Sequence, residues 1–204
     1  MLSPMADAQP IPSPQAAEMS IGSQLCTKCG LCCAGALHDN ASAKPHEFES
    51  LRKRGMQVVM GEELRFALPC PHLKGTSCGI YDDRPHVCSR YRCQLLRDVE
   101  AGTADLPDAL LKVREARRLH DAVQQLMPAG MSLPQARSIP RNPQYGRENV
   151  DPELYPALFL HVLALMRYVD QHFRHSDEGP LLSEEVLTMD GPVERLRKDR
   201  HDHV

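Results

Sequence analysis

CTKCGLCC, residues 26–33, holds four of the eight cysteines in this chain of 204 residues. Two residues between Cys26 and Cys29 let both sulfurs reach one ion, as in structural zinc sites, and the same spacing serves the irons of a cluster. Gly30 suits a chain that must turn with positive φ while backbone N–H groups point at the sulfurs. Because the stretch is too compact to be a strand or a regular helix throughout, we interpret it as a ligand loop.

Cys32 extends the spacing to C-x2-C-x2-C, which bacterial ferredoxins also use around a [4Fe–4S] cluster. The ferredoxin run continues with three residues and Cys-Pro, whereas here Cys33 follows at once and Ala34 comes next. The spacing therefore favours iron–sulfur over zinc without excluding zinc. Side chains of adjacent residues tend to diverge, so Cys32 and Cys33 are candidates for two different centres.

The other four cysteines lie between residues 70 and 93, among prolines and glycines that favour turns. Such a loop-like stretch needs a cross-link to hold it. Eight thiolates divide into two four-cysteine sites, or into one site and spare redox thiols. His72 and His86 lie in the same stretch and are candidate substitutes for a sulfur ligand, although a surface or hydrogen-bonded histidine is the commoner outcome.

Composition and charge limit the classes of protein to consider. A formal net charge of -3 lacks the basic excess expected of a nucleic-acid binder. The first 20 residues have neither the basic start nor the apolar run of a secretory signal, and residues 156–166, the most apolar stretch, are fewer than the about 20 that a membrane span needs. We therefore expect a cytoplasmic protein whose clustered cysteines bind metal instead of forming disulfides.

The run CGIYDDRPHVC, residues 78–88, together with C-x2-C-x2-C-C, closely resembles the CxxCxxCC family of zinc- or iron-chelating proteins, also called YkgJ-like cysteine cluster proteins. The resemblance covers about residues 26 to 93. Ser89 stands after Cys88 where the family commonly has arginine, and Arg90 comes one position later. By this resemblance the metal ligands are Cys26, Cys29, Cys32, Cys33, Cys70, Cys78, Cys88 and Cys93.

The family is often labelled as iron–sulfur oxidoreductases, and it includes the flagellin lysine N-methylases. The resemblance thus implies a metal-binding protein that holds an iron–sulfur cluster, most simply [4Fe–4S], or zinc. We consider three roles: a redox or electron-transfer protein with a redox partner, a zinc-stabilised module that binds another protein, and a methyltransferase-related enzyme. The radical-SAM run C-x3-C-x2-C, the P-loop and G-x-G-x-x-G do not occur in the sequence.

Tyr81, Arg84 and Pro85 lie between expected ligands. In a structural role Pro85 fixes the turn, Arg84 pairs with Asp82 or with a carbonyl group, and Tyr81 packs against the site. In a functional role Arg84 neutralises part of the negative charge of a four-thiolate centre.

The predicted fold class is α+β, with a small irregular, metal-stapled cysteine domain and a mainly helical C-terminal half. We expect a flexible segment over residues 1–22, the cysteine domain over 23–100 and the helical region over 101–204. Residues 45–54 should form a short helix closed by Gly55. The runs 56–60 and 63–68 should form a hairpin that returns Cys70 to the first cysteines.

The helical region shows one clear apolar stripe. Spacings of three and four from Leu106 to Leu126 predict a helix that ends before Pro128. A second helix should begin after Asp151-Pro152, run to about Phe173 and pack on the first. We expect a Pro-rich loop over 128–150, a hydrogen-bonded core role for His161 and a short helix capped by Ser183.

Overall fold

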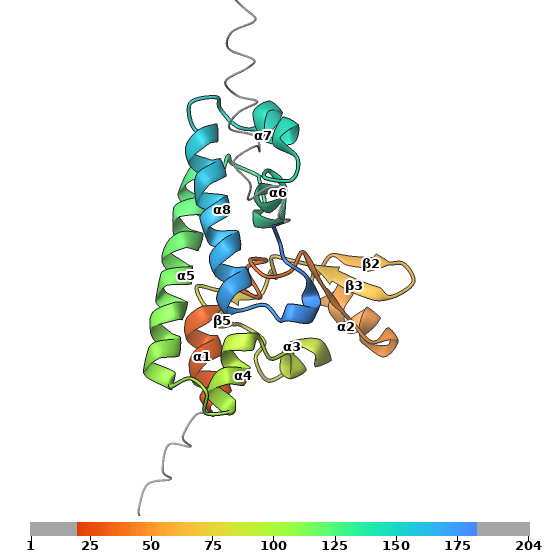
Figure 1. Ribbon diagram of the computed structural model, residues 1–204. Helices are drawn as coiled ribbons and strands as arrows, with labels where there is room; N and C mark the ends of the chain where they lie inside the picture. The colour runs from red at the N-terminus through yellow and green to blue at the C-terminus, as the bar shows by residue number, and fades with distance from the viewer. Residues whose placement is uncertain (1–19, 183–204) are drawn as a thin grey trace, which may run out of the picture.

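The computed structural model describes residues 20–182. It has small antiparallel sheets in the N-terminal part and mostly helices beyond, which confirms the α+β class. Two long helices run side by side along one side of the molecule, and the larger sheet projects from the other side (Figure 1). The described elements are α1 (Ile21–Cys29), β1 (Asn40–Ser42), η1 (Pro45–Glu47), α2 (Phe48–Lys53), β2 (Val58–Met60), β3 (Leu64–Ala67), β4 (Leu73–Lys74), β5 (Ser77–Cys78), α3 (His86–Arg90), α4 (Gln94–Glu100), α5 (Leu106–Leu126), α6 (Leu133–Ser138), α7 (Pro143–Asn149), α8 (Tyr155–His172) and η2 (Ser176–Glu178).

Helices α5 and α8 form the main packing pair, as predicted. The apolar stripe of α5 buries Val113 and Val123 in the same core as Val162 and Val169 of α8. The Asp105 side chain caps α5 by accepting a hydrogen bond from the backbone N–H of Asp108 at 2.7 Å. The first helix therefore has the predicted boundaries.

The predicted start of the second helix is wrong by a few residues. Asp151 does not cap α8 but begins a turn, in which its carboxylate accepts from the N–H of Glu153 at 2.8 Å and its carbonyl from the N–H of Tyr155 at 2.9 Å. The helix begins at Tyr155, and Pro156 occupies its first turn, where a missing N–H has no cost. His161 is hydrogen-bonded as expected, through Nδ1 to the carbonyl of Ala157 at 2.8 Å, although it is only half-buried.

The expected Pro-rich loop over 128–150 is also wrong, because this segment contains α6 and α7. Ser132 and Gln135 form a capping box at the start of α6, and Pro134 and Pro143 each lie in the first turn of a helix. Leu133 and Ile139 are fully buried in the main core. The prolines therefore mark helix starts here and not a loop.

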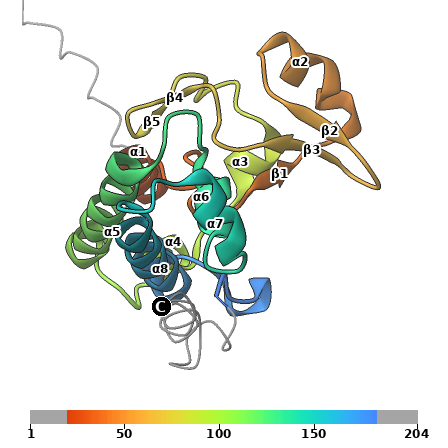
Figure 2. The same ribbon diagram turned by 90° about the horizontal axis from the view of Figure 1, so that it is seen from above.

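The larger sheet has the strand order β1-β3-β2 and is antiparallel throughout. The predicted hairpin is confirmed, with Val59 opposite Arg65. The predicted short helix is present as η1 and α2, followed by Gly55 with φ of 71°. Leu51, Met56 and Phe66 form a second, smaller core. Figure 2 shows α2 and the larger sheet on the far side of the molecule from α5 and α8.

The cysteine-bearing segments are more regular than predicted. Helix α1 already begins at Ile21, inside the expected flexible segment, and it carries Cys26 and Cys29. Only Cys32 and Cys33 lie in the turn that follows, so the interpretation of 26–33 as a ligand loop is half wrong. The stretch 70–93 contains β4, β5 and α3, and Cys93 occupies the position just before α4. No helix within residues 20–182 has the length and apolar character of a membrane span, and the helix expected after Ser183 lies outside the described residues.

Candidate metal centre

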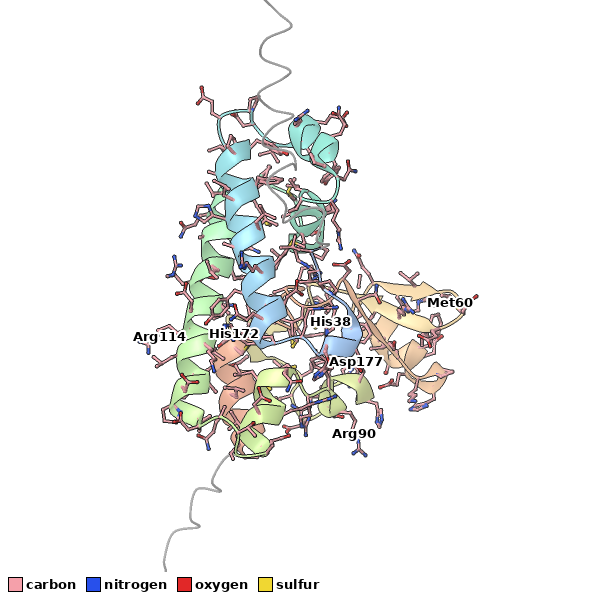
Figure 3. All side chains as sticks on the ribbon, viewed as in Figure 1. His38, Met60, Arg90, Arg114, His172 and Asp177 are labelled. Carbon is pink, nitrogen blue, oxygen red and sulfur yellow. The ribbon has the colours of Figure 1, made fainter. Side chains whose placement is uncertain are left out.

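All eight cysteines line one cavity of about 390 Å³, and all eight are free thiols. The cavity lies where α1, α3 and α4 meet the two sheets, and its lining comes from residues between Ser20 and Leu96 together with Phe173 at the end of α8. His38, which also lines it, lies between the helical layer and the larger sheet (Figure 3). The two groups of cysteines, far apart in the sequence, therefore converge in space.

Helix α1 presents Cys26 and Cys29 one turn apart on the same face. The helix ends because Gly30 adopts a left-handed conformation, with φ of 67°, and its N–H bonds to the carbonyl of Cys26 at 3.2 Å. A Cβ atom at Gly30 would lie 2.9 Å from both Cα and the carbonyl oxygen of Thr76. The positive φ is as predicted, and glycine also permits the close approach of the β4–β5 hairpin.

The β4–β5 hairpin is fixed against the end of α1. The Thr76 hydroxyl donates to the carbonyl of Thr27 at 2.6 Å. Cys70 donates its backbone N–H to the carbonyl of Cys33 at 2.8 Å, so the chain returns Cys70 to the first cysteines, as predicted. Cys78 on β5 stands opposite Leu73 on β4. These contacts bring Cys33, Cys70 and Cys78 together.

Backbone N–H groups lower the pKa of several thiols. The N–H of Leu31 does so for Cys29, that of Leu96 for Cys93 and that of His72 for Cys70. A lower pKa favours the thiolate, the form that binds metal.

Burial has the opposite and larger effect on the thiols. It raises the pKa of Cys33 and Cys93 to about 11 and that of Cys29 and Cys88 to about 12. Neighbouring thiols add to the rise, because each thiolate repels the next. Cys88 is itself an exposed residue but lines the cavity among other cysteines. A cation inside the cavity would offset this cost of forming thiolates.

Two arginines bring positive charge to the cavity wall. Arg84 and Arg92 both oppose the burial-driven rise in the pKa of Cys26. The guanidinium of Arg84 lies 3.9 Å from the centre of the Tyr81 ring, and the Tyr81 hydroxyl is 2.7 Å from that of Ser23. Tyr81 thus packs against the site as expected, while Arg84 contacts Tyr81 and not Asp82 or a carbonyl group. Arg92 was not predicted, since nothing in its spacing distinguishes it.

The two candidate histidines do not reach the cavity. His72 bonds through Nε2 to the carbonyl of Arg54 at 2.8 Å. His86 is exposed, and its backbone N–H bonds to the carboxylate of Glu47 at 2.8 Å. Neither residue lines the cavity, so the structure gives both of them structural contacts.

Sequence reasoning missed two aromatic side chains in the wall. His38 and Tyr91 both line the cavity, and their rings meet edge to face with centroids 5.1 Å apart. The Tyr91 hydroxyl donates to the carboxylate of Glu178 at 3.3 Å. Burial raises the pKa of Tyr91, which keeps this hydroxyl protonated. No sequence pattern pointed to either residue, because their partners lie far away in the chain.

The donor set fits a thiolate-binding metal. No aspartate or glutamate is among the residues that line the cavity, whereas magnesium and calcium prefer carboxylate oxygens. Sulfur ligands suit zinc and iron–sulfur clusters. Within residues 20–182, no three Cys, His, Asp or Glu side chains are already placed to hold one ion. The thiols surround the cavity without meeting at a single point.

Comparison with known proteins agrees with this donor set. Residues 25–108 match the family model CxxCxxCC, described as "Putative zinc- or iron-chelating domain". The matched range contains all eight cysteines and ends inside α5. Neither the curated proteins nor the solved structures contain a significant match. The match confirms the predicted family, and residues 25–108 form a zinc- or iron-chelating domain of the CxxCxxCC family.

Proposed function

We propose that the domain binds an iron–sulfur centre and that the protein transfers electrons or senses redox state. The observation that carries this proposal is the convergence of eight thiols on one cavity of about 390 Å³. A water molecule takes up about 30 Å³ in the liquid, so the cavity has room for a polynuclear centre. The C-x2-C-x2-C spacing of Cys26, Cys29 and Cys32 supports the same choice.

The protein would supply the metal ligands, positive charge near the centre and an opening through which a redox partner can approach. When bound, an iron–sulfur centre supplies one-electron oxidation and reduction. The cysteines would hold it, the backbone N–H of Leu31 would favour the thiolate form of Cys29, and Arg84 and Arg92 would offset the negative charge of the centre. Cys26 and Cys88 are exposed, which leaves an edge of the centre open to a redox partner. Free thiols suit a reducing compartment, for which we propose the cytoplasm.

The second candidate is a zinc-stabilised protein-interaction module. Its support is that Cys29 and Cys93 belong to the main hydrophobic core, together with residues of α5 such as Val113. Metal bonds there would stabilise the helices themselves. A methyltransferase-related activity stays a prediction from the family resemblance alone.

Metal and sulfide analysis distinguishes the two candidates. The full chain is purified without oxygen, and iron, zinc and acid-labile sulfide are measured for each chain, together with the visible and electron paramagnetic resonance spectra before and after dithionite reduction. We expect iron and sulfide in similar amounts and a signal that changes on reduction. Stoichiometric zinc without sulfide would reject the redox proposal and support the interaction module. His86→Ala, outside the cavity, is the control that should retain the full metal content.

A further inference from the structure

We infer that the eight thiols form two separate four-cysteine centres, whose ligands are Cys26, Cys29, Cys32 and Cys93 in the first and Cys33, Cys70, Cys78 and Cys88 in the second. The inference rests on the proposed metal binding and specifies which thiols act together. We call the two sets the helical centre and the sheet centre.

The division follows the two hydrophobic cores. Cys29 and Cys93 are 8% and 9% exposed and belong to the main core, and Cys32 packs against that core. Cys70 packs against the second core, as does Val87, the neighbour of Cys88. The main core therefore holds three cysteines of the first set, and the second core holds Cys70 of the second set and the neighbour of Cys88.

Backbone contacts tie the sheet centre together. Cys33 accepts the N–H of Cys70 at 2.8 Å, and Gly79, next to Cys78, donates its N–H to the carbonyl of His72 at 2.8 Å. Helix α3, which carries Cys88, is hydrogen-bonded to η1. At the start of α3, the N–H of His86 donates to the carboxylate of Glu47, the last residue of η1.

The helical centre lies between α1 and α4, which pack against each other. Cys26 and Cys29 are one turn apart on α1, and Cys93 occupies the position just before α4. Helix α1 also packs against β5, so the two centres lie side by side near the end of this helix.

Adjacent Cys32 and Cys33 are where the two centres diverge. The Cys32 side chain packs towards the main core, whereas the Cys33 carbonyl bonds to Cys70 on the other side. Two consecutive cysteines can thus serve two centres, which gives the double cysteine a physical role.

The test compares pairs of serine substitutions in the full chain, prepared without oxygen. Cys26→Ser and Cys88→Ser are used because both residues are exposed and their loss disturbs packing least. Each single variant should retain half of the wild-type metal. Cys26→Ser with Cys93→Ser, within one centre, should also retain half, whereas Cys26→Ser with Cys88→Ser should retain none. Circular dichroism identifies any variant that has failed to fold.

The outcomes separate the inference from the proposal on which it rests. Wild-type protein without metal would overturn the proposed function itself. Metal-containing wild type whose single variants lose all metal would overturn only the division into two centres, as would a within-centre pair that retains less than its single members. If the metal is iron, the reduced wild type should also show a magnetic interaction between neighbouring centres, which each single variant should abolish.

Discussion

Arg84 is placed to adjust how readily the thiols ionise. Burial raises the pKa of Cys26, Cys33 and Cys88, and the Arg84 guanidinium opposes that rise. Arg84→Gln should therefore weaken metal binding about tenfold at neutral pH, since one pKa unit corresponds to about 1.4 kcal/mol. Competition with a coloured chelator measures the effect. Arg90→Gln is the matched control, because Arg90 points outward from the end of α3 (Figure 3), and an equal effect in both variants would contradict the role given to Arg84.

The thiol pKa values also predict how the metal-free protein responds to pH. Burial raises the pKa of Cys33 and Cys93 to about 11 and that of Cys29 to about 12, from a model-compound value of 9.0. Between pH 9 and about pH 11, these thiols have lost their protons in the unfolded chain but keep them in the folded chain. The free energy of unfolding therefore falls as pH rises through this range. Unfolding by urea should show this loss from about pH 9 upwards. Stability that is constant or rises over that range would contradict the burial of the thiols.

At the scale of elements, the sequence predicts those helices and strands whose residue periodicity or turn residues determine them locally. The stripe of α5 and the β2–β3 hairpin have strong local signals and are confirmed. Strand β1 was missed because its three residues, NAS, carry no alternation and pair with β3 only after the chain has folded back. The sequence of helix α1 predicts a loop because the spacing of Cys26, Cys29 and Cys32 is a stronger signal than the helical periodicity of its nine residues. The convergence of the cysteines followed from the hairpin, but the packing of Cys32 against the main core and of Cys70 against the second core depends on tertiary structure.

Gly30 allows a direct test of how α1 meets the β4–β5 hairpin. Both Gly30 and Gly75 have positive φ, but only at Gly30 would a Cβ atom collide with the backbone of Thr76. Alanine at either site should cost about 1–2 kcal/mol for the left-handed conformation. Gly30→Ala should cost about 1–3 kcal/mol more from the collision and should reduce metal binding by displacing Cys78. Equal unfolding free energies and equal metal content in the two variants would show that this close approach is unimportant.

At the scale of the whole molecule, hydrogen bonds connect the helical half to residues 35–39, the segment that follows the first four cysteines. Arg137 of α6 is 2% exposed and donates to the carbonyl of Gly35 at 2.7 Å and to Asp39 at 3.0 Å. Arg174, after α8, donates to the carbonyl of Leu37 at 2.6 Å. These bonds link residues outside the matched family domain to the segment 35–39, which carries His38 of the cavity wall.

Loss of the Arg137 hydrogen bonds should therefore lower the stability of the whole protein. Arg137→Ala leaves the buried carbonyl of Gly35 without this partner and should lower the free energy of unfolding by about 1–3 kcal/mol, as measured by urea denaturation. Arg114→Ala, which removes a side chain that points into solvent from α5 (Figure 3), should have an effect within about 0.5 kcal/mol. If the two variants were equally stable, the helical half would not depend on this contact.

X-ray absorption at the metal edge of protein purified without oxygen tests the central claim most directly. Because the cavity is lined by eight thiols and no carboxylate, the account predicts an inner shell made of sulfur alone, with four sulfurs at about 2.3 Å if the metal is zinc. An inner shell of nitrogen or oxygen, or protein that retains no metal at all, would contradict it.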